Sequence, residues 1–154
     1  MFVNSPTIDS IQIPTNLYSN KVLFTTGHLF LISFIVFLLY SDKNVNECIL
    51  GLCLVLTYIC AALFWYNPIQ HSRMHKIDAI VAKVSIVSFL LYTFFMKKLS
   101  CYVYYSYCLL FLGMIVTAYL SQYYSSQQWC SDNHIVSHGL LHTFCFLGSF
   151  YAFL

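Results

Sequence analysis

The sequence predicts an all-α fold, a polytopic transmembrane helix bundle with about five spans. Its composition supports this, because 60% of the 154 residues are hydrophobic and only 8% are charged, against about 25% charged residues in an ordinary soluble domain. A soluble globule could not bury so much apolar surface, so lipid is the expected solvent. We therefore expect an integral, multi-pass membrane protein, with an endomembrane as the favoured compartment.

The spacing of the apolar runs gives the number of spans. Five runs each approach the roughly 20 residues that a helix needs to cross the hydrocarbon core of a bilayer. Strands are disfavoured because their open backbone cannot be satisfied in lipid, and no alternating pattern is long enough for a barrel. The expected spans are residues 22–40, 49–66, 77–96, 102–120 and 135–154.

Polar residues mark the ends of these spans. The span endings are, in order, Ser41-Asp42-Lys43-Asn44, Asn67-Pro68, Lys97-Lys98 and a polar loop over residues 121–133. Residues 1–20 lack the basic start and short apolar core of a signal peptide. Pro6, Pro14 and a run of Ser, Thr and Asn predict that they form a polar leader. Residues 21–154 are expected to form a single transmembrane domain.

Charge and cysteine content exclude several classes of protein. Seven Lys and Arg against five Asp and Glu leave a net charge of +2, which excludes a nucleic-acid binder that needs a concentrated cationic face. The seven cysteines form no Cys-x-x-Cys pair, so free thiols in apolar surroundings are expected. The numbers of Lys and Arg residues on the two membrane sides are similar, so the orientation of the chain in the membrane stays open.

Membrane lipid is the expected partner, and a homo-oligomer is compatible with so small a core.

The histidines gather on one side of the predicted topology. With five spans, the N-terminus and the second and fourth loops share one membrane side, called side A here; the opposite side is side B. The acidic residue Asp78, at the start of the third span, also lies near side A. Ionisable groups within a membrane are costly, so this gathering indicates a functional site. The six histidines near side A are His28, His71, His75, His134, His138 and His142.

The last span carries the most informative spacing. His134, His138 and His142 recur every four residues and so share one helix face, about 6 Å apart along the axis. Two such imidazoles can reach one metal ion, and a catalytic zinc site has three protein ligands. We expect His28, His138 and His142 to bind zinc. Asp78 is expected to orient or deprotonate a water molecule, and His134 to relay protons at the mouth. The alternative roles of Asp78 are third zinc ligand in place of His28, or hydrogen-bond partner of a ligand.

Each of these residues also has a structural interpretation. A histidine within a membrane can hydrogen-bond across helices, and Asp78 at a helix start is suited to capping. His71 and His75 suit a solvated loop or contacts with lipid headgroups. His28 follows Thr25-Thr26-Gly27, which favours close helix packing.

Two short segments resemble motifs of a known superfamily. Arg73-Met74-His75-Lys76-Ile77-Asp78 and Ser137-His138-Gly139-Leu140-Leu141-His142 resemble motifs of the membrane hydrolases that include alkaline ceramidases, adiponectin/progestin receptors and haemolysin III-type proteins. The resemblance implies a divergent, shortened relative that hydrolyses a lipid amide or ester with a zinc-bound hydroxide. It also implies metal-site positions for Asp78, His138 and His142.

The chain departs from that superfamily in two respects. The superfamily has seven spans, and its second helix carries a Ser-x-x-x-His pair where this chain has Ala61 and Trp65. The leading expectation is a zinc-dependent lipid hydrolase with a His/Asp site at one membrane face. The alternative is a non-catalytic membrane protein with a lipid-binding or scaffold role, which Ala61 and Trp65 favour. A di-iron oxidase would need more histidine clusters, and a proton-coupled transporter would show an inverted repeat.

Overall fold

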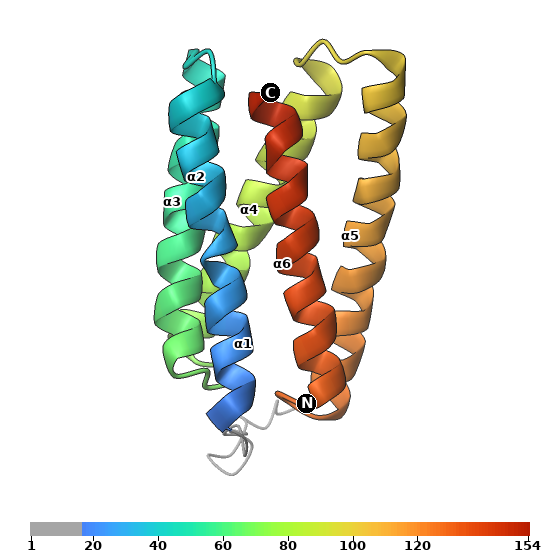
Figure 1. Cartoon of the computed structure of the whole chain (residues 1–154). Coiled ribbons are helices and arrows are strands. Elements are labelled where there is room, and N and C mark those ends of the chain that lie inside the picture. The colour runs from blue at the N-terminus through green and yellow to red at the C-terminus, as the bar shows by residue number, and fades with distance from the viewer. Residues whose placement is uncertain (1–16) are drawn as a thin grey trace, which may run out of the picture.

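The computed structural model describes residues 17–154, with side chains from Lys21 onward, and all of its regular elements in that range are helices. They form an elongated bundle (Figure 1). Five helices are long and apolar enough to cross a membrane, with α1 and α2 together making the first. The prediction of an all-α, five-span fold is confirmed. The helices are α1 (Leu17–Gly27), α2 (Leu29–Tyr40), α3 (Val45–Tyr66), α4 (Arg73–Phe95), α5 (Cys101–Gln127) and α6 (Asp132–Phe153).

Most helices extend beyond the apolar runs that predicted them. Helix α5 continues to Gln127, where a loop was expected from residue 121, because residues 121–127 contain no Gly or Pro to stop it. Helix α3 starts at Val45, since the Asn44 side chain accepts the backbone N–H of Glu47 at 3.0 Å and caps the helix. Of the expected leader, residues 1–16 lie outside the described residues, and residues 17–20 belong to α1.

The first span contains a local irregularity at His28. The backbone N–H of His28 bonds to the carbonyl of Thr25 at 3.0 Å, three residues back, instead of to that of Phe24. The ring Nδ1 of His28 lies 2.8 Å from the released Phe24 carbonyl. A carbonyl only accepts, so Nδ1 carries the proton and donates it. The ring thus replaces the missing backbone bond, and α1 and α2 follow one another along one edge of the bundle (Figure 1).

Helix α6 holds the bundle together. It packs against α1, α2, α4 and α5, whereas α5 packs along α6 and has no comparable packing with α4.

Buried residues form one core cluster near each end of the bundle. The cluster near side A includes Leu23, Phe64, Trp65, Trp129 and Ile135, and the cluster near side B includes Phe37, Leu50, Leu54, Tyr92 and Phe153.

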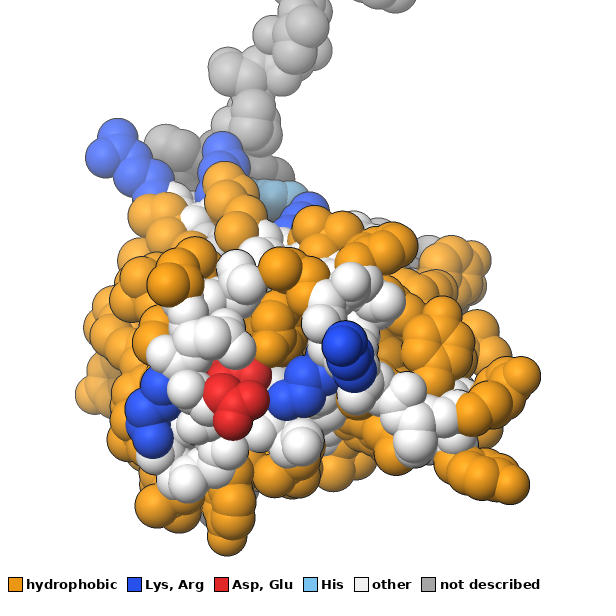
Figure 2. Space-filling model, turned by 90° about the horizontal axis from the view of Figure 1, so that it is seen from above, with side chains coloured by type: hydrophobic (Ala, Val, Ile, Leu, Met, Phe, Trp, Pro, Cys, Tyr) orange, Lys and Arg blue, Asp and Glu red, His pale blue; other side chains and the backbone are white. Residues whose placement is uncertain are grey.

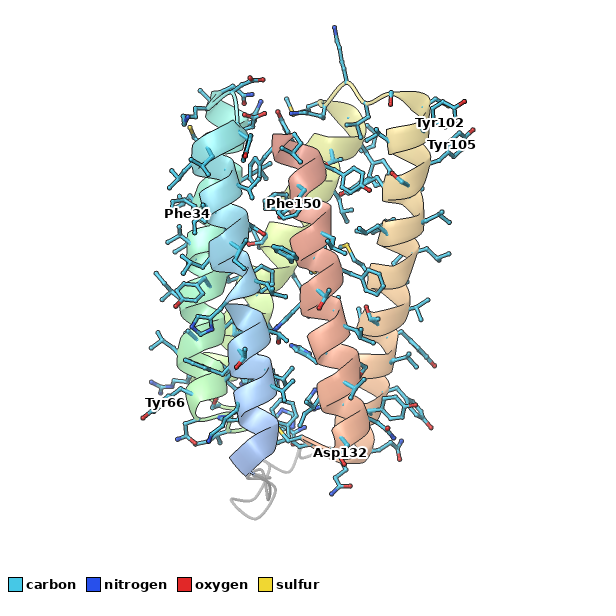
Figure 3. The ribbon with its side chains drawn as sticks, viewed as in Figure 1. Phe34, Tyr66, Tyr102, Tyr105, Asp132 and Phe150 are labelled. Carbon is cyan, nitrogen blue, oxygen red and sulfur yellow. The ribbon has the colours of Figure 1, made fainter. Side chains whose placement is uncertain are left out.

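The outer surface is that of a protein in lipid. Hydrophobic side chains surround the bundle, and charged ones gather at the side B end that faces the viewer in Figure 2. Tyr102 and Tyr105 point away from the bundle near side B, and Tyr66 points away near side A (Figure 3). Tyrosines at these two levels are typical of the two membrane–water interfaces. The chain is therefore a multi-pass membrane protein.

Candidate functional site

A cavity of about 310 Å³ lies between α3, α4, α5 and α6. Its side A half, here called the polar end, holds four ionisable residues from α4 and α6 together with hydroxyl and amide groups of α5. Its side B half, called the apolar end, is formed mainly by hydrocarbon and aromatic side chains. The polar end includes His75, Asp78, Ser121, Gln122, His134 and His138, and the apolar end includes Leu54, Phe89, Leu90, Tyr107 and Met114.

The structure brings together four of the five site residues expected from the sequence. Asp78, His134, His138 and His142 line the cavity. His28 does not, because its ring lies between Phe24 and Tyr58, at centroid distances of 4.9 Å and 5.4 Å. Its Nδ1 is also committed to the Phe24 carbonyl. His28 thus has a structural contact in the first span and is separate from the other histidines.

His138 and His142 are held by hydroxyl groups of neighbouring helices. The Nδ1 of His138 lies 2.8 Å from Ser121 Oγ, and the Nδ1 of His142 lies 3.0 Å from Thr26 Oγ1. The Thr26 hydroxyl donates its proton to the Leu23 carbonyl at 3.2 Å, so its oxygen accepts from Nδ1–H of His142. In that tautomer the Nε2 of His142 has a free lone pair. The two histidine rings are 4.8 Å apart between centroids.

His75 takes part in the cap that starts α4. Ser72 is the N-cap, and its hydroxyl accepts the backbone N–H of His75 at 3.1 Å. In return, Nδ1 of His75 accepts the backbone N–H of His71 at 3.0 Å. This arrangement is a variant of the capping box, in which Glu or Gln normally makes the returning contact. Because Nδ1 accepts, the neutral ring of His75 carries its proton on Nε2.

His134 repeats this arrangement at the start of α6. Ser131 is the N-cap and accepts the backbone N–H of His134 at 3.4 Å, and Nδ1 of His134 accepts the N–H of Cys130 at 3.2 Å. Cys130 has φ 56° and His71, its counterpart before α4, has φ 61°, so both caps follow a left-handed residue. Burial raises the pKa of the Cys130 thiol to about 12. His134 therefore has a capping role, while its expected role as a proton relay stays a prediction.

Aromatic rings line the cavity near side A. Trp65 stacks on Trp129 with centroids 5.9 Å apart and an interplanar angle of 14°, and it lies 5.0 Å from His138. Trp129 is anchored through its Nε1–H, which donates to the Pro68 carbonyl at 3.2 Å. The Nε1–H of Trp65 is buried and has no partner among the described residues. The sequence indicated Trp65 as an interfacial aromatic residue and as a departure from a motif, but not as part of a cavity wall.

The expected zinc ligands do not form a ligand set in this arrangement. Zinc is held by three or four protein ligands. Within residues 21–154, no group of three or more His, Cys, Asp or Glu side chains is placed to hold a metal ion. His28 packs against Phe24 and Tyr58 and does not line the cavity with His138 and His142, so the third expected ligand is missing. The residues as arranged do not fit the expected zinc centre.

Comparison of the chain with models of protein families, with curated proteins and with solved structures found no match.

Proposed function

We propose that this protein binds a single-chain lipid or a similar amphiphile inside the membrane, in the cavity between α3, α4, α5 and α6. The observation that carries the proposal is the division of this cavity into a polar end and an apolar end. A volume of about 310 Å³ falls at the lower end of the range for small-molecule sites, roughly 300–1,000 Å³. Such sites are mostly apolar and contain a few placed polar groups.

The polar end supplies both donors and acceptors for a headgroup. Trp65 contributes a buried N–H without a partner, and the neutral rings of His75 and His134 carry their protons on Nε2. Asp78 contributes a carboxyl group, and His142, which lines the cavity one helix turn beyond His138, contributes an unprotonated Nε2. A buried donor without a partner costs free energy, so a ligand that accepts from Trp65 would be stabilised.

A cavity-filling substitution tests the proposal. Ala118 lines the cavity from α5, whereas Val116 is on the same helix, is exposed and does not line it. Ala118→Trp is expected to weaken binding of a fluorescent single-chain amphiphile in nanodiscs by at least about tenfold, because the indole takes the space of the chain. Val116→Trp is the control and should bind as wild type does. Absence of binding to the wild type, or equal binding by Ala118→Trp, would refute the proposal.

A zinc-dependent lipid hydrolase is the second candidate. The observation that favours it is that Asp78, His138 and His142 line one cavity, although they are not placed as a ligand set. Elemental mass spectrometry on purified protein tests it, with His138→Ala and His142→Ala beside the wild type. About one zinc per chain in the wild type, lost in both variants, would support the hydrolase. A wild type without metal after zinc is supplied would reject it.

A further inference from the structure

The middle of α4 carries a charged residue that the proposed function has not used. Lys83 lies ten residues after Arg73, the first residue of α4, which places its Cα about 15 Å along the helix. Its side chain is exposed and lines the cavity. Among the described side chains it has no hydrogen bond or ion pair. A lysine at this depth of a membrane is costly and indicates a function.

The Cα–Cβ bond of Lys83 leans toward the polar end of the cavity. Side chains on a helix tilt toward its N-terminus, which for α4 is the side A end. The flexible stem of lysine allows its methylene groups to stay in apolar surroundings while the ammonium reaches a polar region. Asp78 is the nearest carboxylate along α4, but five residues place it about 140° around the helix from Lys83, and no ion pair joins the two. The remaining ionisable groups at the polar end are His75, His134 and His138, which are hydrogen-bonding groups and not counter-ions.

Lys83 lines the cavity from α4, and α4 is not closely packed against α5, the next helix that lines it. The two helices meet near side B, where Phe94 packs on Tyr107 with centroids 5.0 Å apart. Near side A, the side-chain amide of Gln70, just before α4, donates to the Ser125 carbonyl of α5 at 3.5 Å. Between these two contacts α4 and α5 lack close backbone packing, and the cavity there is lined by Lys83 and by small residues such as Ala82 and Ala118.

We propose that the ligand of this cavity is a single-chain membrane amphiphile with an acidic headgroup, a carboxylate or a phosphate monoester, whose charge pairs with Lys83. This inference rests on the proposed function and specifies its ligand class. The occupant comes from the bilayer because α4 and α5, which line the cavity without close packing between them, are both membrane-spanning helices. Its headgroup lies between Lys83 and the N–H donors of the polar end, and its chain follows the apolar end past Phe89 and Met114.

A comparison of acidic and neutral amphiphiles with the same chain tests this inference. Palmitic acid, palmitoyl lysophosphatidic acid and neutral monopalmitoylglycerol are competed against a fluorescent amphiphile on the full chain in phosphatidylcholine nanodiscs. The wild type is expected to bind at least one of the two acids at least about tenfold more tightly than the neutral ester. Lys83→Gln should lose this preference and Lys83→Arg should keep it. Lys76→Gln is the matched control, because Lys76 is exposed on α4 outside the cavity.

The outcomes separate this inference from the proposed function. Equal binding of all three amphiphiles by the wild type, or an unchanged preference in Lys83→Gln, overturns the inference and leaves the proposed function standing. No binding of any amphiphile to the wild type overturns both. Retained binding of the neutral ester by Lys83→Gln shows that the variant is folded. Displacement by acetate or inorganic phosphate at the concentrations effective for the acidic amphiphiles would show a site for free anions and overturn the lipid assignment.

Discussion

The hydroxyl of Thr26 and the ring of His142 form a hydrogen bond that joins the first span to the last, with 3.0 Å between Oγ1 and Nδ1. The bond holds the His142 ring in place and leaves its Nε2 free. Thr26→Val keeps the shape of the side chain and removes the bond. Polar contacts between helices in membranes contribute on average about 0.6 kcal/mol.

We therefore expect Thr26→Val to lower the free energy of unfolding by about 0.5–1 kcal/mol, measured by reversible unfolding in mixtures of detergent and SDS. Thr25→Val is the control, because Thr25 is exposed and makes no interhelical bond among the described residues. An equal loss in both variants would show that the Thr26 contact contributes nothing specific.

Replacement by alanine is expected to affect stability differently at two glycines, Gly51 and Gly27. A Cβ added at Gly51 would lie 2.6 Å from the Phe37 ring, whereas one added at Gly27 would meet nothing closer than 3.8 Å, at Ala61. Gly51→Ala should destabilise the protein by about 1–3 kcal/mol, because the ring between α2 and α3 has to move. Gly27→Ala should be neutral or slightly stabilising, since alanine favours a helix. Thermal unfolding of both variants checks the difference, and equal midpoints would contradict the packing at Gly51.

The buried carboxylate near side B depends on one lysine. Glu47 is fully buried, its Oε1 accepts from the Tyr92 hydroxyl at 2.7 Å, and Lys97 Nζ lies 3.6 Å away. Lys97→Met leaves the buried charge without a counter-ion, which costs about 3–5 kcal/mol of stability. Adding Glu47→Gln to that variant should recover part of the loss. Lys98→Met, at an exposed neighbour, should change stability by less than about 0.5 kcal/mol, and a comparable loss there would argue against the pair.

The Cys130 thiol is expected to resist alkylation at neutral pH. Its burial raises its pKa to about 12, and only the thiolate reacts, so at pH 8 about one thiol in 10⁴ is reactive. Alkylation by iodoacetamide, followed by peptide mass mapping, should accelerate about tenfold per pH unit between pH 8 and pH 11. Cys101, which is exposed, provides the comparison, and unfolding in SDS should abolish the protection. Rapid labelling of Cys130 at pH 8 in the folded protein would contradict its burial.

Hydrophobic runs were sufficient to predict the five spans, because a bilayer imposes both length and composition on a helix. Their ends were harder to predict. Helix α5 ends where the backbone becomes extended at Gln128, with φ −152° and ψ 116°, and a glutamine in the sequence does not indicate such a change. The caps at Ser72 and Ser131 could have been recognised, since each serine precedes a histidine by three residues, as in a capping box.

The sequence predicted which ionisable residues lie near the same membrane side, but not how their side chains are arranged around the cavity. The four-residue spacing correctly placed His138 and His142 beside each other on α6. Nothing in the spacing revealed that His28 bonds to its own helix at Phe24, since that contact depends on a local change in the backbone ladder. Trp65 and Lys83 are brought to the cavity by packing between helices that are distant in sequence.

The polar end of the cavity lies toward only one face of the membrane. A headgroup bound there, with its chain directed toward side B, belongs to a lipid of the side A leaflet. Occupancy should therefore follow the composition of that single leaflet and be insensitive to the other. In vesicles with asymmetric leaflets, the same total amount of ligand would fill the cavity or leave it empty according to the leaflet that holds it, so the protein would report transbilayer asymmetry.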